Sequence, residues 1–351
     1  MKHYTIEEAK EIITGYKGRH IRIMEVCGTH THEIFKLGIR SLLPESIELI
    51  SGPGCPVCVT PVGYIDEAVM LALEKNAIIC TFGDLIRVPG TKMSLADARR
   101  QGGDIRMVYS PMDALDLAKT NPDREVVFLA VGFETTTPVT CLSVKHAIRD
   151  NVKNFSILTA NKTMPNAYMA LKDSADAFLY PGHVNAITGE SICREMLEKY
   201  GVSGVIAGFT AEELMDAIAV IIVGLESGKP FFENCYKRVV REDGNVKAVE
   251  AINEVMESID TEWRGLGIIP QSGLKLRDNF ATYDARKKFA LPNIKGVPNP
   301  ACRCGDVLQG KCKPSDCKVF GKGCTPQHPV GACMVSDEGA CSAYYQYGGT
   351  F

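Results

Sequence analysis

Short runs of β-branched and aliphatic residues alternate with longer amphipathic segments through the first two thirds of the chain. This alternation is typical of βα units, in which successive strands form mainly parallel sheets and the helices cover them. The expected strands are residues 21–26, 47–51, 77–82, 105–109, 125–131, 155–159, 177–180 and 205–208. Helices are expected at residues 62–74, 191–200 and 211–226. The pattern therefore predicts an α/β fold.

The length of the chain suggests more than one structural unit. At roughly 150 residues per domain, 351 residues allow two or three. Residues 23–32 resemble residues 129–138, since both run from a strand into a Thr-rich turn that opens a helix. This is compatible with a duplication into two similar lobes, and equally with the general preference for Thr and Gly at such junctions. After Pro230 the strand pattern weakens, and residues 292–300 have the proline content of a linker.

Charge and hydropathy exclude several classes of function. A net charge of −3 gives no reason to expect binding to nucleic acid or to an anionic membrane surface. The most apolar run, residues 217–225, is too short to span a bilayer and reads as a buried helix. Residues 1–10 are polar and lack the apolar core of a signal peptide. We therefore expect a cytoplasmic protein.

Cysteine is concentrated at the C-terminal end. Seven of the fourteen cysteines fall within the last fifty residues, at 302, 304, 312, 317, 324, 333 and 341. Thiolates among Gly and Pro are typical ligands of iron–sulfur clusters and zinc. The intervening gaps of 1, 7, 4, 6, 8 and 7 residues lack the C-x2-C knuckles usual for zinc. Disulfide scaffolds are typical of small secreted domains. We favour an iron–sulfur cluster, with zinc and disulfides or free thiols as alternatives.

Three more cysteines lie where predicted strands end, which is where parallel α/β sheets bind ligands. Cys27 opens a Cys-Gly-Thr-His turn in which His30 can orient or protonate a ligand on the sulfur, or serve only as a cap partner. Cys55 and Cys58, flanked by Gly and Pro, have the spacing of a redox-active pair. The alternatives for this pair are half of a zinc site completed by Cys27 and a histidine, or two inert core thiols.

Other strand ends carry polar groups that face the same cleft or only cap helices. Glu134 and His183 are the best candidates to face the cleft, and Asp84 is a third. No Gly-x4-Gly-Lys-Ser/Thr loop or Gly-x-Gly-x2-Gly fingerprint occurs, so nucleotide binding has no motif in its favour.

Several unusual motifs follow one another along the chain. They are Cys-Gly-Thr-His-Thr-His at 27–32, Gly-Pro-Gly-Cys-Pro-Val-Cys at 52–58, Thr-Phe-Gly-Asp-Leu at 81–85 with Val-Pro-Gly at 88–90, Gly-Phe-Glu-Thr-Thr at 132–136, Cys-Thr-Pro at 324–326, Cys-Met-Val-Ser at 333–336 and Glu-Gly-Ala-Cys at 338–341. In this order they closely resemble the HypD family of [NiFe]-hydrogenase maturation factors, and the resemblance covers nearly the whole chain.

The resemblance implies two similar α/β lobes around a cleft and a C-terminal region that holds a [4Fe-4S] cluster. We therefore divide the chain into a first lobe at 1–121 with Cys27 and the Cys55/Cys58 pair, a second lobe at 122–238, and a helical connection with the cluster region at 239–351. It also implies partners: HypC, and HypE, which delivers cyanide made with HypF. The product is an Fe(CN)2CO unit, transferred through HypC to the hydrogenase large subunit.

Individual roles carry over by motif. Cys27 would hold the iron together with a cysteine of HypC, and Cys55 and Cys58 would exchange electrons with the cluster. We choose Cys304, Cys317, Cys324 and Cys341 as cluster ligands, because their intervals of 12, 6 and 16 residues resemble the family pattern. Cys333 is the first reserve and Cys302 another. The alternative functions are a cluster-dependent thiol–disulfide oxidoreductase and a zinc-stabilised binding module.

Overall fold

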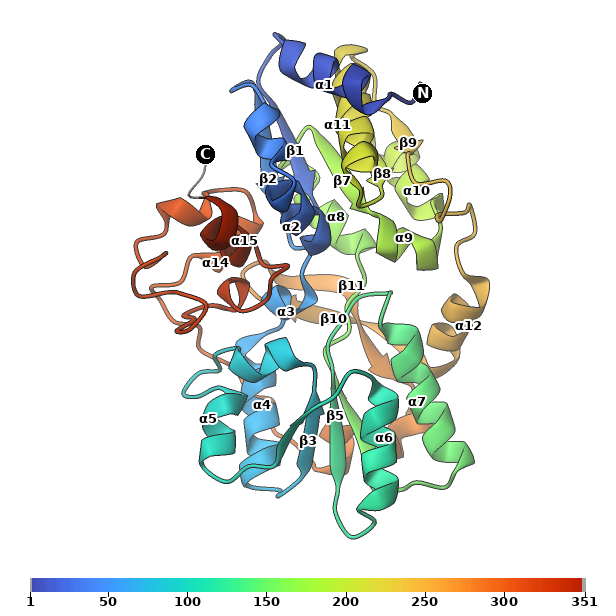
Figure 1. The fold of residues 1–351 in the computed structure, drawn as a ribbon. Coiled ribbons are helices and arrows are strands. Elements are labelled where there is room, and N and C mark those ends of the chain that lie inside the picture. The colour runs from blue at the N-terminus through green and yellow to red at the C-terminus, as the bar shows by residue number, and fades with distance from the viewer. Residues whose placement is uncertain (1, 349–351) are drawn as a thin grey trace.

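Two parallel sheets and one antiparallel hairpin frame the structure, a computed structural model that describes residues 2–348 (Figure 1). The first sheet has the strand order β2-β1-β7-β8-β9, and the second has the order β4-β3-β5-β6. Neighbouring strands in both sheets are parallel. We call each sheet with its helices the first lobe and the second lobe. The predicted α/β class is confirmed.

All strands of the two sheets except β9, which was not predicted, agree closely with the predicted segments. Those of the first sheet are β1 (Ile21–Glu25), β2 (Ile47–Ser51), β7 (Ala177–Pro181), β8 (Gly204–Ala207) and β9 (Phe232–Asn234). Those of the second are β3 (Ile78–Thr81), β4 (Ile105–Met107), β5 (Val126–Ala130) and β6 (Phe155–Thr159). β5, β6 and β7 are buried along their whole length, because helices cover both faces of each sheet.

Helices lie on both faces of each sheet. Those of the first lobe are α1 (Ile6–Gly15), α2 (Gly28–Lys36), α8 (Pro165–Leu171), α9 (Gly182–Thr188), α10 (Ser191–Tyr200) and α11 (Ala211–Glu226). Those of the second lobe are α4 (Val62–Leu73), α5 (Leu95–Arg100), α6 (Pro111–Thr120), α7 (Thr137–Arg149), α12 (Val246–Val255) and α13 (Ala285–Lys288). Among the described residues, no helix combines the length and the apolar character needed to cross a membrane.

The chain passes between the lobes more than once, so the lobes are not consecutive segments. β1 and β2 belong to the first sheet, β3 to β6 to the second, and β7 to β9 to the first again. The predicted division at residues 121 and 122 therefore differs from the sheets, because β1 finds its second partner in β7, more than 150 residues later. The first crossing, residues 52–61, contains α3 (Pro56–Val59) and both cysteines of the Cys-x2-Cys motif.

The two lobes share a strand order, in which the first strand lies between the second and the third. This order makes β1 equivalent to β3 and β7 equivalent to β5. The two similar lobes are therefore present, but the repeat that we matched between residues 23–32 and 129–138 pairs β1 with β5, which are not equivalent. Both matched segments resemble each other because each is a strand that leads into a helix.

A long hairpin, β10 (Met256–Trp263) and β11 (Gly267–Leu276), lies between the lobes (Figure 1). The connection predicted to be helical thus contains α12 and this hairpin. Burial alternates along β10, because only one of its faces packs against the protein, and such a strand lacks the continuous apolar run that marked the others. Residues 292–300, the predicted linker, have no helix or strand and press against α4, where a Cβ on Gly63 would lie 2.1 Å from the Ile294 carbonyl oxygen.

The C-terminal segment has little regular structure. It contains α14 (Cys304–Leu308), α15 (Ala340–Tyr347) and short 3-10 turns such as Ala332–Met334. Phe35 of α2 packs edge-on against Tyr344 of α15, and Arg22 of β1 donates to the Gly310 carbonyl at 2.7 Å. The cysteine-rich tail is thereby held beside the first sheet, close to the first crossing.

Candidate thiol and metal site

Cys27 lies two residues after the end of β1, where the strand order of the first sheet reverses between β1 and β7. Ligands of open α/β sheets bind at such switch points. The backbone N–H groups of Thr29 and His30, at the start of α2, lie near the Cys27 thiol and act to lower its pKa. Burial nevertheless raises the pKa of Cys27 to about 12, and the Glu338 carboxylate adds to the rise. The thiol is therefore protonated at neutral pH until a cation binds beside it.

The glycine-rich crossing brings the Cys-x2-Cys motif against Cys27. The Gly28 N–H donates to the Gly54 carbonyl at 3.1 Å. A Cβ on Gly54 would lie 2.4 Å from the Cys27 Cα atom, so only glycine fits there. A Cβ on Gly28 would lie 3.3 Å from the Cys55 Cβ. Cys27 and Cys55, predicted to share a cleft, therefore lie on directly contacting turns.

Cys55 and Cys58 flank the first turn of α3. Cys55 precedes the helix, and its Sγ accepts a hydrogen bond from the Cys58 N–H at 3.4 Å. Pro56 occupies the first helical position, where its missing N–H has no helical partner. Burial raises the pKa of the Cys58 thiol well above its usual value, whereas a hydrogen bond with Cys333 acts in the opposite direction. The pair is thus shaped by a rigid turn and joined to the tail.

Most tail cysteines surround one narrow pocket. Cys302, Cys304, Cys317, Cys324 and Cys341 line it. The Cys302 and Cys304 sulfurs are 3.0 Å apart, and the Val330 N–H donates to the Cys324 sulfur at 3.3 Å. All four cysteines that we chose as cluster ligands are brought together here, with Cys302 beside them. Cys312 instead lines a separate groove with Arg22 and Glu48.

Cys333 connects this pocket to the Cys-x2-Cys motif. Its thiol is fully buried in one cluster with Cys304 and Cys58, and both of these thiols affect its pKa. Cys341 lines the pocket beside Cys304, whose thiol raises the pKa of Cys341. Thiol contacts therefore run from Cys341 through Cys304, Cys333 and Cys58 to Cys55.

Arg264, in the turn of the β10–β11 hairpin, is a residue that the sequence analysis missed. Its Nε donates to the Thr60 carbonyl at 2.7 Å and its backbone N–H to the Val59 carbonyl at 2.8 Å. Burial lowers the pKa of Arg264, whereas the nearby thiols of Cys304, Cys333, Cys302 and Cys58 raise it. The guanidinium is thus a buried cation among these sulfurs. No motif marks it, because a turn in a late hairpin brings it there.

Glu338, also unnoticed in the sequence, closes the tail over the Cys27 turn. Its Oε1 accepts a hydrogen bond from the Thr29 hydroxyl at 2.7 Å. Burial raises the pKa of Glu338, and the charge of Asp84 adds to the rise. Asp84 follows β3, so both lobes and the tail meet around this carboxylate. The Glu-Gly-Ala-Cys motif contains Glu338, but only the fold shows its contact.

The side chain of His30, on α2, is fully buried against the end of β8. Its Nε2 lies 3.2 Å from the Ala207 carbonyl and 3.0 Å from the Gly208 carbonyl, so this nitrogen carries the proton. Burial lowers the pKa of His30 to about 4, and the ring is neutral at pH 7. Nδ1, which has no hydrogen-bond partner among the described residues, is consequently an acceptor. This state disfavours the proton-donating role considered for His30.

Glu134 follows β5, at the switch point of the second sheet. Its Oε1 accepts from the Met164 N–H at 2.9 Å, while Oε2 has no partner among the described residues. Burial raises the pKa of Glu134 to about 7. The charges of Glu134 and Cys27 both raise the pKa of Tyr168, after burial and Cys193, so the three groups share one region. His183, the other cleft candidate, stacks on Phe209 with ring centroids 3.9 Å apart.

Fold and site together define a cysteine-rich α/β protein whose clustered thiols fit metal binding. The family model HypD, described as the hydrogenase formation hypA family, matches residues 3–348. Hydrogenase maturation factor HypD of Azotobacter vinelandii is 45% identical over 341 residues, covering 94% of this chain and 90% of that protein. The proteins of that name from Cupriavidus necator and Escherichia coli are 46% and 45% identical, with the same coverage. The chain belongs to the HypD family of hydrogenase maturation factors.

Proposed function

We propose that this chain is a redox-active scaffold that, with HypC and HypE, assembles the Fe(CN)2CO unit of the [NiFe]-hydrogenase active site. Membership of the HypD family supports a role in hydrogenase maturation. The observation that carries the specific proposal is the series of thiol contacts from the tail pocket through Cys333 and Cys58 to Cys55, beside Cys27. Such a series suits electron delivery to an iron-binding residue. We place the assembly in the cytoplasm, where thiols are kept reduced.

Cys27 is the residue to which we assign the iron of the Fe(CN)2CO unit, which is a substrate of the scaffold. A cysteine of HypC would be the second protein ligand. Ligation needs the thiolate, and the raised pKa of Cys27 means that iron binding must release a proton. The N–H groups of Thr29 and His30 at the start of α2 would stabilise its negative charge, since both act to lower the pKa of Cys27. After assembly, HypC would carry the unit to the hydrogenase large subunit.

We assign a resident [4Fe-4S] cluster to Cys304, Cys317, Cys324 and Cys341, which line the same pocket. When bound, the cluster would supply electrons one at a time. Cys302 competes for the place of Cys304, since the two sulfurs are 3.0 Å apart. Single Cys302→Ser and Cys304→Ser variants test the assignment: the ligand is the one whose loss lowers both iron and sulfide. Zinc without sulfide in the anaerobically purified chain would instead favour a zinc-stabilised binding module.

Cys55 and Cys58 are the thiols that we assign to two-electron exchange. Oxidation of the pair forms one disulfide bond and releases two electrons and two protons. The turn of α3 holds the two residues three positions apart, and Cys58 contacts Cys333. Arg264 would stabilise thiolates formed along this route, because it is a buried cation among the same sulfurs.

Infrared spectroscopy of the complex with HypC tests the scaffold. The chain is purified anaerobically with HypC from cells that contain HypE, and cyanide and carbonyl stretching bands are recorded. We expect these bands in the wild type and their loss in Cys27→Ala. Cys141→Ala is the matched control, because Cys141 is a buried thiol of α7 in the core of the second lobe. Bands of equal strength in Cys27→Ala would contradict the assignment.

The same thiol contacts favour a second candidate, a cluster-dependent thiol–disulfide oxidoreductase. That function needs Cys55 and Cys58 but not Cys27. Disulfide reduction by the chain alone, unchanged in Cys27→Ala and without infrared bands in a well-formed complex, would support it over the scaffold.

A further inference from the structure

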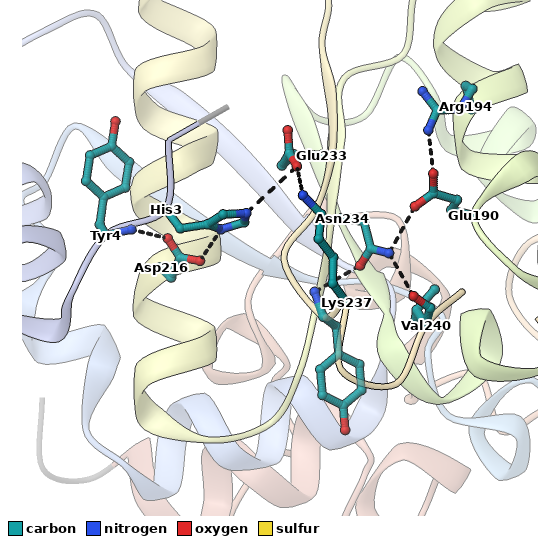
Figure 2. A network of polar contacts seen from close by, with 10 residues as sticks. His3, Tyr4, Glu190, Arg194, Asp216, Glu233, Asn234, Lys237 and Val240 are labelled. Carbon is teal, nitrogen blue, oxygen red and sulfur yellow. Dashed lines mark hydrogen bonds and ion pairs between the residues drawn. The ribbon is translucent and has the colours of Figure 1, made fainter. Parts of the chain in front are cut away.

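The N-terminal arm, residues 2–5, lies along the first lobe on the side opposite to the cysteine-rich tail (Figure 1). Its His3 reaches α11 and the end of β9, between the carboxylates of Asp216 and Glu233 (Figure 2). Cys235 is the next residue after β9. These residues come from three distant segments, and none belongs to the motifs that identify the family or to the proposed scaffold.

The three side chains offer one nitrogen, one oxygen and one sulfur at close range. The ligand atoms of His3, Asp216 and Cys235 all lie within 4.8 Å of one another. His3 Nδ1 is 2.9 Å from Asp216 Oδ2, and His3 Nε2 is 3.9 Å from Glu233 Oε1. The Asp216 side chain is 12% exposed and Cys235 is partly buried, whereas the His3 side chain is 41% exposed. The site is thus walled by protein on one side and open where the arm crosses it.

Neighbouring groups orient the Asp216 carboxylate. The Tyr4 N–H donates to Oδ1 at 2.8 Å, which turns Oδ2 toward His3. An Asp216 carboxylate oxygen also lies within 4.8 Å of the Cys235 sulfur. Burial, followed by the charges of Asp216 and Glu233, raises the pKa of Cys235. Lys237 offsets part of this negative charge through its ion pair with Glu233 at 3.0 Å.

We propose that His3, Asp216 and Cys235 bind one divalent metal ion with the ligand preference of Zn²⁺. This ion would fasten the N-terminal arm to α11 and β9. Imidazole, carboxylate and thiolate are the three ligand types that Zn²⁺ accepts in proteins, whereas Mg²⁺ and Ca²⁺ require oxygen. Three protein ligands leave the fourth tetrahedral position to water. The ion replaces the proton on Cys235, so binding releases that proton and neutralises the repulsion between thiolate and carboxylates.

Co²⁺ is the probe for this site, because a thiolate ligand gives it a charge-transfer absorption band. The full chain is used with the proposed cluster bound to its tail cysteines. Loosely bound ions are removed, the chain is titrated with Co²⁺, and Zn²⁺ is then added as a competitor. His3→Gln and Cys235→Ser remove one ligand each. Cys141→Ser removes a buried thiol from the second lobe and is the matched control.

We expect the wild type and Cys141→Ser to bind one more equivalent of Co²⁺ than the other two variants, whose affinity falls at least about tenfold. Zn²⁺ should raise the melting temperature of the wild type but not of His3→Gln. Equal uptake and equal melting shifts in wild type and His3→Gln would overturn the proposal. His3→Gln decides the outcome even if Cys235→Ser fails to fold, because His3 lies on an exposed arm outside the core.

Discussion

Cys58 and Cys333 lie in one buried cluster, close enough that each thiol shifts the pKa of the other. Cys58 is on the first crossing between the lobes, and Cys333 is on the C-terminal tail. This contact joins two cysteine motifs that are 275 residues apart in the sequence. It gives the tail pocket a route to Cys55 and so to the turn that holds Cys27.

Replacing Cys333 with Ser should interrupt this route without emptying the pocket. We expect iron and sulfide to remain, and reduction of a preformed Cys55–Cys58 disulfide to slow at least about tenfold, because exchange depends on contact between sulfurs. The rate is measured by trapping free thiols after dithionite is added. Cys312→Ser is the control, since Cys312 lies in a separate groove. Loss of iron in Cys333→Ser would instead make Cys333 a cluster ligand.

Removing the Arg264 charge should make the proposed tail cluster harder to reduce. A nearby cation stabilises the more negative, reduced state of the cluster. Arg264→Met is therefore expected to lower the reduction potential of the cluster, by up to about 100 mV at an effective dielectric constant near 20. Redox titration followed by paramagnetic resonance measures the shift. Arg149→Met is the control, because that exposed arginine on α7 of the second lobe is paired with Asp150, away from the tail sulfurs. An unchanged potential in a folded Arg264→Met protein would argue against this role.

Gly54→Ala should destabilise the junction of the two cysteine turns. The added Cβ would lie 2.4 Å from the Cys27 backbone, which must shift. Overpacking of this kind costs about 1–3 kcal/mol. Chemical unfolding measures the change, with Gly15→Ala as the control, because nothing lies within 4 Å of a Cβ at that position. Equal losses of stability in the two variants would show that the contact does not constrain the turns.

Glu134 should make stability depend on pH. Burial raises its pKa from 4.5 to about 7, so between these values the folded state holds a proton that the unfolded state has lost. Stability should therefore fall as pH rises through this window, by roughly 3 kcal/mol at most. Glu134→Gln should flatten this dependence and stabilise the protein at pH 8. Unfolding measured from pH 4 to 8 tests this, with the exposed Glu74→Gln as control. Parallel curves for Glu134→Gln and wild type would contradict it.

Local sequence patterns located most of the regular structure. The predicted strands at 47–51 and 155–159 and the helices at 191–200 and 211–226 match the structure at both ends. These segments succeed because hydrophobic periodicity is a property of neighbouring residues. β9, β10 and β11 were missed because only part of each is buried, so none has a continuous apolar run. The placing of Cys27, Glu134 and the Cys-x2-Cys loop at strand ends followed from the same patterns.

The amino-acid sequence by itself established the α/β class, the family motifs and the set of candidate thiols. The tertiary structure alone decided which strands share a sheet, because β1 pairs with β7 although all strands of the second sheet lie between them in the sequence. It also decided that Arg264 and Glu338 join the thiols, and that His3, Asp216 and Cys235 meet at the far side. These contacts form only when distant segments pack together, and no spacing along the chain encodes such a meeting.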